Sequence, residues 1–399
     1  MTTRALLLPG LLAVAAAGGG CATGASSPLP GERAKTEDCT AAERTASIRR
    51  GVDFLLSRQN RDGSWGRFES ARPDEVMLGT QATHRAFRAA TTALCCMALM
   101  KHGETAAARE APAGEALDRG LRYLVTAEPD VRVTGDVFYN TWSHAYVLQC
   151  LARALAAPDR AVPKAGMRAA AGRWINALLR IQGANGGWGY YDFGSAFQTQ
   201  TGYMATSFTT ATALLAVAEA RAAGIDVPEP AVRSAVAFLR RLRTADKTYI
   251  YGYYAWKRPG VGYNRPKGSL GRAQSGNLAL RRFTQDVSDD DLRLGLDRML
   301  EFHHFMEIGR GRPIPHEAWY YTAGYYFYYG HWYASEVVQE LPREAQGRYW
   351  QELADVMVFT QNPDGSWMDF PMYDYHFDYG TALALLTLLP AQEALAAAP

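Results

Sequence analysis

One spacing of three residues recurs along the chain and restricts its fold more than any other feature. A glutamine is followed four residues later by a glycine and two residues after that by a tryptophan. This spacing occurs three times, in Gln59, Gly63 and Trp65, in Gln182, Gly186 and Trp188, and in Gln361, Gly365 and Trp367. The tryptophans are 123 and 179 residues apart, close to two and three multiples of about 60 residues. A period of this length indicates stacked helical units, because each unit buries its apolar face only against its neighbours.

Three weaker copies of the repeat lie in the remaining intervals. The helical pattern before each one places Glu128, Arg243 and His304 where the glutamine would fall. We therefore expect six outer helices to begin near residues 43, 114, 166, 230, 290 and 344. Each is followed by an apolar inner helix, near 85–102, 137–156, 204–222, 272–283, 316–338 and 376–389. Apolar residues recur at i, i+3 and i+4 and no segment keeps a period of two, which predicts an all-α protein.

Each part of the repeat has a physical task at a helix junction. The glycine follows a helix end, where a residue that tolerates positive φ closes the turn without strain. The tryptophan then covers the junction, and the glutamine amide bonds backbone groups that a neighbouring helix end leaves unpaired. Closing six such hairpins on one another predicts an α/α toroid (α6/α6 barrel) of about 12 helices.

This pattern resembles the QW repeat of the squalene and oxidosqualene cyclases, and the first copy matches it almost completely. Those enzymes share the α/α-toroid superfamily with the β subunits of protein prenyltransferases and the thioester domains of complement proteins. The resemblance implies one toroid domain over residues 43–390 with a central cavity that the inner helices line. It also implies that the nine repeat residues are structural. The motif therefore identifies the fold, and the chemistry has to be sought in the cavity.

The chemical motifs of these relatives are missing from the chain. The acidic run Asp286–Asp291 fails the Asp-x-Asp-Asp spacing of the cyclase acid, and Ser288 within it is typical of a helix N-cap. The segment around His376 resembles the histidine part of the prenyltransferase zinc site, but its Asp and Cys partners are absent from residues 315–332. The complement thioester sequence is absent too. We predict no metal site and no cofactor, and catalysis stays an open question.

Polar residues nevertheless gather where the inner helices begin. In a toroid these helices run parallel, so their N-terminal ends share one rim of the cavity, and their dipoles favour an anionic ligand group there. The segment His316–Tyr333 is expected to be one inner helix, aromatic on nearly every side. Asn140 and His144 lie one turn apart on another. The candidate cavity residues are Asn140, His144, His316, Glu317, Tyr320, His331, Asp374, His376 and Asp378.

Three functions fit these features. The first is a toroid that binds an apolar or amphiphilic small molecule in its cavity without catalysis. The second is a terpene-cyclase-like enzyme on an isoprenoid or other lipid-like substrate, since aromatic rings stabilise cationic centres. The third is a polysaccharide lyase in which Asn140, His144 and a tyrosine act on a uronate. With a net charge of +2 and no basic cluster, nucleic acid is not an expected partner.

The N-terminus predicts export. Residues 1–20 contain Arg4, an apolar stretch and three glycines before Cys21, which resembles a bacterial lipoprotein signal. That resemblance implies a lipid on Cys21 and a membrane as partner, although Gly18 departs from the usual leucine. Ordinary secretion and an uncleaved anchor remain alternatives. Residues 21–42 are predicted to be a flexible tether. We expect a monomer in the cell envelope of a bacterium, lipid-anchored to a membrane and facing the periplasm or the exterior.

Overall fold

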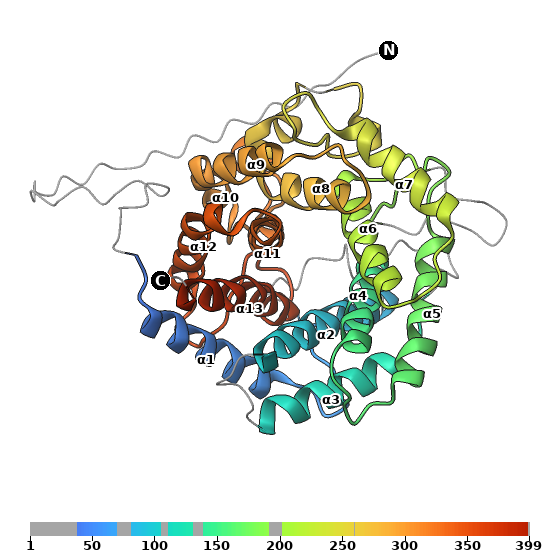
Figure 1. Cartoon of the computed structure of the whole chain (residues 1–399), viewed down its shortest axis with the longest axis vertical. Helices are drawn as coiled ribbons and strands as arrows, with labels where there is room; N and C mark the ends of the chain where they lie inside the picture. Colours follow the sequence, from blue (N-terminus) through green and yellow to red (C-terminus); the bar gives the residue numbers. More distant parts are fainter. Residues whose placement is uncertain are drawn as a thin grey trace, which may run out of the picture.

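Two concentric rings of α-helices form the molecule (Figure 1). The computed structural model describes residues 38–69, 81–104, 111–130, 139–190, 202–258 and 260–397. The signal segment, Cys21 and the tether up to residue 37 lie outside the described residues. Within the part of the chain that is described, no helix is long and apolar enough to cross a bilayer.

The outer ring consists of α1 (Ala41–Arg58), α3 (Ala111–Thr126), α5 (Lys164–Arg180), α7 (Glu229–Leu242), α9 (Asp289–Glu301) and α12 (Gly347–Thr360). The inner ring consists of α2 (Gln81–Glu104), α4 (Thr141–Ala156), α6 (Ser207–Ala222), α8 (Leu270–Phe283), α11 (Phe327–Gln339) and α13 (Tyr375–Ala396). A short additional helix, α10 (His303–Gly309), follows α9. The described residues contain no β-strand, only isolated bridges. The predicted all-α toroid is confirmed.

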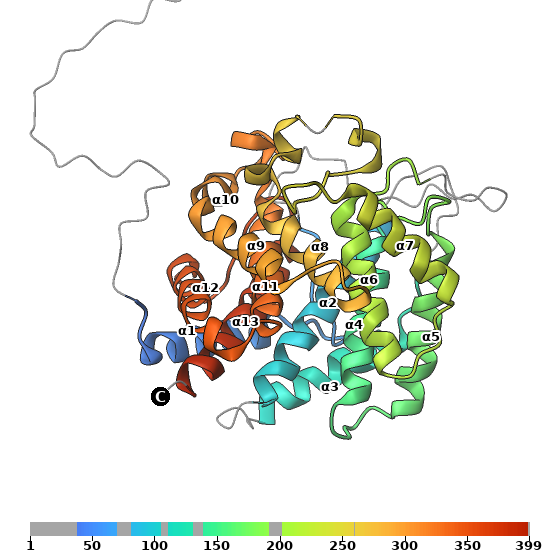
Figure 2. The same ribbon diagram turned by 45° about the horizontal axis from the view of Figure 1, so that its top comes forward.

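The inner ring is closed. Each inner helix packs on the next, and α13 packs back onto α2, so the last helix of the chain lies beside the first inner one. Helices α8 and α11 approach each other closely, since a Cβ on Gly330 would lie 2.6 Å from the Cα of Gly271. In the view tilted by 45°, the segment that joins α7 to α8 lies at the top edge of the molecule (Figure 2).

The three complete repeats form three equivalent junctions. Each tryptophan is at most 1 % exposed. The indole N–H groups of Trp65, Trp188 and Trp367 donate to the carbonyl oxygens ten residues earlier, at 2.7–2.8 Å. Their backbone N–H groups donate to threonine hydroxyls on inner helices, at 2.9–3.0 Å. Each tryptophan thus ties its own outer helix to an inner one.

The glutamines join neighbouring outer helices. The side-chain amide of Gln59 donates to the carbonyl of Ala116 on α3 at 2.8 Å. In the same way Gln182 bonds α7, and Gln361 bonds the Ser47 carbonyl on α1 at 2.9 Å. The last contact closes the outer ring between the end of the chain and its beginning.

One weaker copy keeps the geometry with different residues. Arg243 takes the glutamine position, Lys247 the glycine position and Tyr249 the tryptophan position. Lys247 has a φ of 61°, in the left-handed region that the repeat glycines occupy. Tyr249 is fully buried and bonds Asn277, while Arg243 pairs with Asp291 at 3.0 Å. The repeat therefore depends on backbone shape and burial more than on residue identity.

The acidic run before α9 is a helix start, as predicted. The hydroxyl of Ser288 accepts the backbone N–H of Asp291, and the Asp291 carboxylate accepts the N–H of Ser288. These reciprocal bonds form a capping box, and the aspartates of the first turn complement the helix dipole.

The prediction of one inner helix over residues 316–338 was wrong in its first half. Only α11, from Phe327 onward, is an α-helix, preceded by two 3-10 turns (Trp319–Tyr321 and Gly324–Tyr326). His316, Tyr320 and Tyr321 all have φ between 56° and 64°, which a right-handed helix does not accommodate. The ring Nδ1 of His316 bonds the carbonyl of Tyr321 at 2.7 Å, and this side-chain bond stabilises a loop in place of the helix.

Candidate functional site

A cavity of about 400 Å³ opens among the N-terminal ends of the inner helices. Its wall carries ten tyrosines, three phenylalanines and one tryptophan. These are Tyr139, Tyr146, Tyr190, Tyr251, Tyr254, Tyr325, Tyr326, Tyr329, Tyr375, Tyr379, Phe87, Phe208, Phe370 and Trp142. No Asp, Glu, Lys or Arg of the described residues lines it. The volume falls within the range of about 300–1,000 Å³ that is typical of small-molecule sites.

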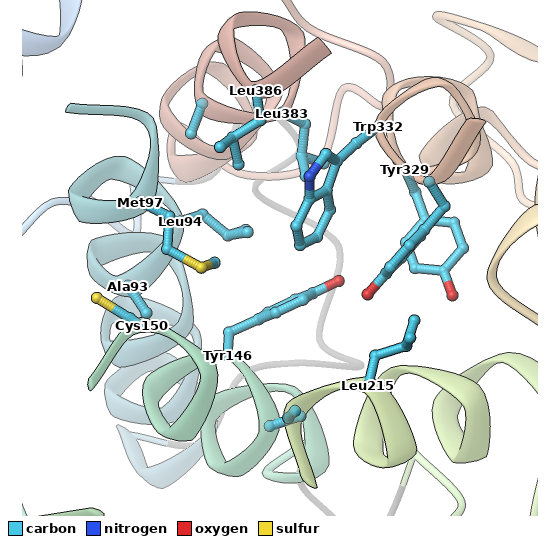
Figure 3. Packing of buried hydrophobic residues seen from close by; sticks show 14 of the residues in the cluster. Ala93, Leu94, Met97, Tyr146, Cys150, Leu215, Tyr329, Trp332, Leu383 and Leu386 are labelled. Carbon is cyan, nitrogen blue, oxygen red and sulfur yellow. The ribbon is translucent and has the colours of Figure 1, made fainter. Parts of the chain in front are cut away.

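Side chains near the middle of the inner helices fill the interior of the ring next to the cavity. Figure 3 shows Tyr146, Leu383 and Leu94 pointing toward the axis of the ring, with Trp332 and Leu386 beside them. Trp332 and Leu386 are at most 3 % exposed and do not line the cavity. The ring is therefore a pocket open at one end and packed at the other.

Ring-on-ring contacts hold the aromatic wall in place. The rings of Phe208 and Tyr326 meet edge to face at 5.1 Å, and those of Phe87 and Tyr375 stack at 5.1 Å. Trp142 stacks on Phe208 at 5.9 Å. Such offset and edge-to-face pairs are the geometries that aromatic rings prefer. The wall is therefore built before any ligand binds.

One polar cluster interrupts the wall at the start of α13. The Tyr379 hydroxyl lies 2.9 Å from Oδ1 of Asp369 and 2.5 Å from Nδ1 of His376. Burial lowers the pKa of His376 even though Asp369 acts in the opposite direction. Asp369 itself is fully buried, and its Oδ2 has no hydrogen-bond partner in the described part of the chain.

The proton positions in this cluster follow from its chemistry. An ionised Asp369 can only accept, so the single hydroxyl proton of Tyr379 points at Oδ1. The Tyr379 oxygen then accepts from Nδ1–H of His376, which leaves Nε2 of this neutral imidazole without a proton. Because the His376 ring lines the cavity, the cluster presents a proton acceptor backed by a buried carboxylate.

A second polar cluster lies across Phe370 from the first. The Phe370 ring is 5.5 Å from that of His376 and 5.8 Å from that of Tyr325. Tyr325 donates to Nε2 of His316 at 3.0 Å. Nδ1 of His316 carries the proton, because its partner is a carbonyl oxygen. Burial lowers the pKa of His316, which favours this neutral form.

Three further tyrosines complete the second cluster. The hydroxyls of Tyr190 and Tyr251 share a hydrogen bond, and that of Tyr326 lies 3.4 Å from Tyr190. Tyr190 follows the second complete repeat, Tyr251 follows the Arg243 copy, and Tyr326 directly precedes α11. Four hydroxyls and one imidazole therefore meet at one side of the cavity.

Two of the predicted residues, His316 and His376, reach the cavity. His144 does not, because its ring packs against Trp174 of the outer helix α5 at 5.6 Å. Burial, helped by Arg180, lowers the pKa of His144 to about 3, so it is a neutral core residue. The amide of Asn140 approaches the carbonyl of Asp130 at 3.4 Å. The expectation that Asn140 and His144 share the rim does not hold, since neither lines the cavity.

The remaining candidates have other contacts. Asp374 and Asp378 pair with Arg58 of α1, and Asp378 also accepts the backbone N–H of Gly66 at 3.1 Å. Burial raises the pKa of Asp378 to about 6. These carboxylates anchor the start of α13 to the outer ring and do not line the cavity.

Glu317, Tyr320 and His331, the last of them in α11, also lie away from the cavity wall. Glu317 is exposed and 3.8 Å from Arg312. Tyr320 packs on Phe305. His331 contacts His303 of α10, with 3.1 Å between the Nε2 atoms.

Sequence reasoning missed the residues that complete both clusters, and the repeat contains a signal that identifies three of them. Tyr190, Tyr251 and Asp369 each stand two residues after the aromatic residue of their repeat. At that position the chain leaves the junction and turns toward the cavity. Within the described residues, no three His, Cys, Asp or Glu side chains come close enough to hold a metal ion.

Comparison with known proteins supports the fold. The family model of the squalene-hopene cyclase C-terminal domain matches residues 31–141. No curated protein matches the chain significantly. The predicted likeness to squalene-cyclase-type toroids is confirmed, while the lipoprotein signal stays a prediction.

Solved structures share the architecture at low sequence identity. The type II terpene cyclase MstE from Scytonema has 15 % identity and a TM-score of 0.51, over 89 % of this chain and 100 % of that one. A protein from Actinoplanes has 16 % identity and a TM-score of 0.53, over 87 % and 99 %. A D-mannose isomerase has 11 % identity and a TM-score of 0.52, over 88 % and 98 %. Because terpene and sugar enzymes both match, these likenesses establish the toroid fold alone.

Proposed function

We propose that the protein binds an isoprenoid-like, largely apolar molecule in its central cavity. The observation that carries this proposal is the wall itself, which has fourteen aromatic rings and no charged side chain of the described residues. An apolar chain gains about 25 cal/mol for each Å² that it removes from water. The aromatic faces would in addition stabilise a cationic centre on the ligand. A variant of MstE was solved with geranylgeranyl dihydroxybenzoate, which shows that a toroid of this kind can hold a prenyl chain.

A second function, catalysis on the same ligand, is favoured by the cluster of Asp369, Tyr379 and His376. In the arrangement derived above, Nε2 of His376 would accept one proton from the bound molecule. The resulting imidazolium would be stabilised through Tyr379 by the buried carboxylate. The electron pair of the broken bond to hydrogen would stay on the ligand, as when a carbocation loses a proton from the carbon next to the cationic centre. This proton transfer uses only His376 and Tyr379 of the cavity wall, the buried Asp369 behind them and the ligand itself.

The polysaccharide-lyase alternative lacks the cavity residues that it requires. Asn140 and His144, which it required, do not line the cavity, and no lysine or arginine of the described residues is present on the wall to bind a uronate carboxylate. We therefore do not carry it further.

Analysis of co-purifying molecules tests the proposal. Organic extracts of protein purified from a bacterial host are expected to contain an isoprenoid-like compound that extracts of the unfolded protein lack. Titration with geranylgeraniol should change the fluorescence of Trp142, and a Trp142→Phe variant identifies that signal. A protein that binds neither geranylgeraniol nor any extracted lipid, but binds an oligosaccharide, contradicts the proposal.

The N-terminal prediction extends the proposal to the cell envelope. A lipid on Cys21 would hold the toroid at a membrane, where apolar ligands are concentrated. Cys21→Ser should move the protein from the membrane fraction to the soluble fraction. If the variant still sediments with membranes after a carbonate wash, the lipid anchor is disproved.

A further inference from the structure

A buried positive charge lies directly behind the second polar cluster. Arg272 of α8 is 1 % exposed, and its Nη2 donates to the carbonyl oxygens of Tyr263 and Gly268. Its Nη1 is buried without a hydrogen-bond partner among the described residues. No described carboxylate forms an ion pair with it, whereas the less buried Arg153 of α4 pairs with Glu219 and Glu336. A buried charge without a counter-charge is costly, which indicates that something else offsets it.

The guanidinium faces two tyrosines of the cavity wall. Its Cζ lies 4.9 Å from the ring centre of Tyr251 and 5.5 Å from that of Tyr326. Both distances are within the range of cation–π contacts, of about 6 Å. The positive charge therefore acts on the cavity through these two rings. Burial raises the pKa of the Tyr326 hydroxyl, and the positive charge of Arg272 opposes this larger effect.

The cavity side of the same tyrosines offers hydrogen-bond donors. The hydroxyls of Tyr190, Tyr251 and Tyr326 form one linked group, while that of Tyr325 donates to His316. The buried carboxylate Asp369 belongs to the other cluster, beyond Phe370. This end of the cavity thus combines hydroxyl donors with a net positive surrounding, which is what an anionic oxygen group requires.

We propose that the cluster of Tyr190, Tyr251 and Tyr326, with Arg272 behind it, binds an anionic oxygen headgroup of the ligand. The proposal rests on the proposed function, because the apolar chain of the same molecule occupies the aromatic cavity. The ligand is then an amphiphile with its chain toward Trp142 and Leu383 and its headgroup at the tyrosines. A carboxylate and a diphosphate share the required chemistry.

The experiment compares three ligands with one chain and different headgroups. Geranylgeraniol, geranylgeranoic acid and geranylgeranyl diphosphate are titrated into the wild-type protein by calorimetry, below their aggregation concentrations. At least one anionic ligand should bind about tenfold or more tightly than the alcohol, as expected for a charge pair at an effective dielectric constant of about 20. The anionic ligand whose affinity exceeds that of the alcohol by more shows whether the cluster prefers a carboxylate or a diphosphate.

Two kinds of variant assign the effect to the cluster. Arg272→Met should abolish the preference for the anion and leave the affinity for the alcohol within about twofold. Arg281→Met is the matched control, because it removes the same charge from the same helix about 13 Å away, where Arg281 pairs with Asp289. If Arg272→Met does not fold, Tyr251→Phe and Tyr326→Phe test the same contact and should each reduce the preference several-fold.

The outcomes separate the two proposals. Wild-type protein that binds the alcohol as tightly as both anions contradicts the headgroup proposal and supports the apolar cavity. Protein that binds none of the three ligands contradicts the proposed function itself. An anion preference that persists in Arg272→Met, or that Arg281→Met removes equally, shows that the charge acts from elsewhere and overturns the assignment to this cluster.

Discussion

The outer-helix junctions and the cavity wall use aromatic residues in opposite ways. At the junctions, Trp65, Trp188 and Trp367 are completely buried and repeat one set of backbone hydrogen bonds. At the cavity, the residue two positions after the junction aromatic varies between repeats. It is a tyrosine in two of them, Tyr190 and Tyr251, whose hydroxyls share a hydrogen bond, and the buried Asp369 in a third. The constant junction positions therefore maintain the ring, whereas the positions that face the cavity vary and carry its polar groups.

Removing a junction tryptophan should have the largest effect on stability. Trp188→Ala is expected to lower the free energy of unfolding by about 3–5 kcal/mol, because it empties a fully buried site and leaves the Leu178 carbonyl unpaired. Chemical denaturation measures the change. Trp256→Ala is the control, since Trp256 is 41 % exposed and belongs to no junction; its effect should stay within about 0.5 kcal/mol. Equal effects of the two substitutions would remove the distinction between the regions.

The anchor of α13 predicts a pH dependence of stability. The pKa of Asp378 is raised to about 6 by burial, whereas an unfolded aspartate titrates near 3.9. Between these values the folded protein binds more protons than the unfolded chain. The contribution of Asp378 to the free energy of unfolding should therefore fall as pH rises from about 4 to 6, by up to about 3 kcal/mol.

Denaturation across this pH range tests the prediction. Asp378→Asn should remove the fall, while Asp290→Asn, which changes a side chain that is 91 % exposed, should keep it. A variant curve parallel to that of the wild type at every pH would show that Asp378 does not titrate in this range.

The glutamines provide a smaller test of the junctions. Gln361→Leu should cost about 1–3 kcal/mol, because the Ser47 and Gly365 carbonyls lose their donor. Gln59→Leu breaks the corresponding bonds to Ala116 and Gly63 and should cost the same. Thermal or chemical unfolding of both variants measures the costs. A large difference between them would mean that the junctions are not equivalent.

The polar cluster beside the cavity provides a test of similar size. Tyr379→Phe should lower the free energy of unfolding by about 1–3 kcal/mol, because the buried Asp369 carboxylate loses its hydroxyl donor. It should also lower the pKa of His376 further, because the imidazolium loses the acceptor that links it to Asp369. Histidine NMR titration detects the shift, and His144 serves as an internal reference. A pKa of His376 that does not change contradicts the proposed proton arrangement.

Much of the fold could be predicted because the same residue spacing marks equivalent helix junctions several times along the chain. Gly63, Gly186 and Gly365 have φ values of 87–91°, and the same spacing located the outer and inner helices to within a few residues. The failure over residues 316–326 has a local cause. A run of aromatic residues is compatible with both a buried helix and a packed loop. The hydrogen bond of His316 to the carbonyl of Tyr321 stabilises the loop.

The site was less predictable than the fold. His316 and His376 were found because histidines are rare and stood near helix starts. Asp369, Tyr325 and Tyr379 were missed, because their importance depends on which side chains lie across the cavity from them. His144 was misplaced for a related reason, since the side of an inner helix that meets the outer ring also buries polar residues, here against Trp174.

Photo-crosslinking with a diazirine-bearing geranylgeraniol tests most directly whether the aromatic cavity is the working site. Mass spectrometry of the digested protein locates the labelled residues. We expect labels on residues that line the cavity, among them Met204, Trp142 and Phe208. Unlabelled geranylgeraniol should compete with the probe and reduce this labelling. Labels confined to the outer surface, or spread without competition over α1, α3 and α5, would contradict it.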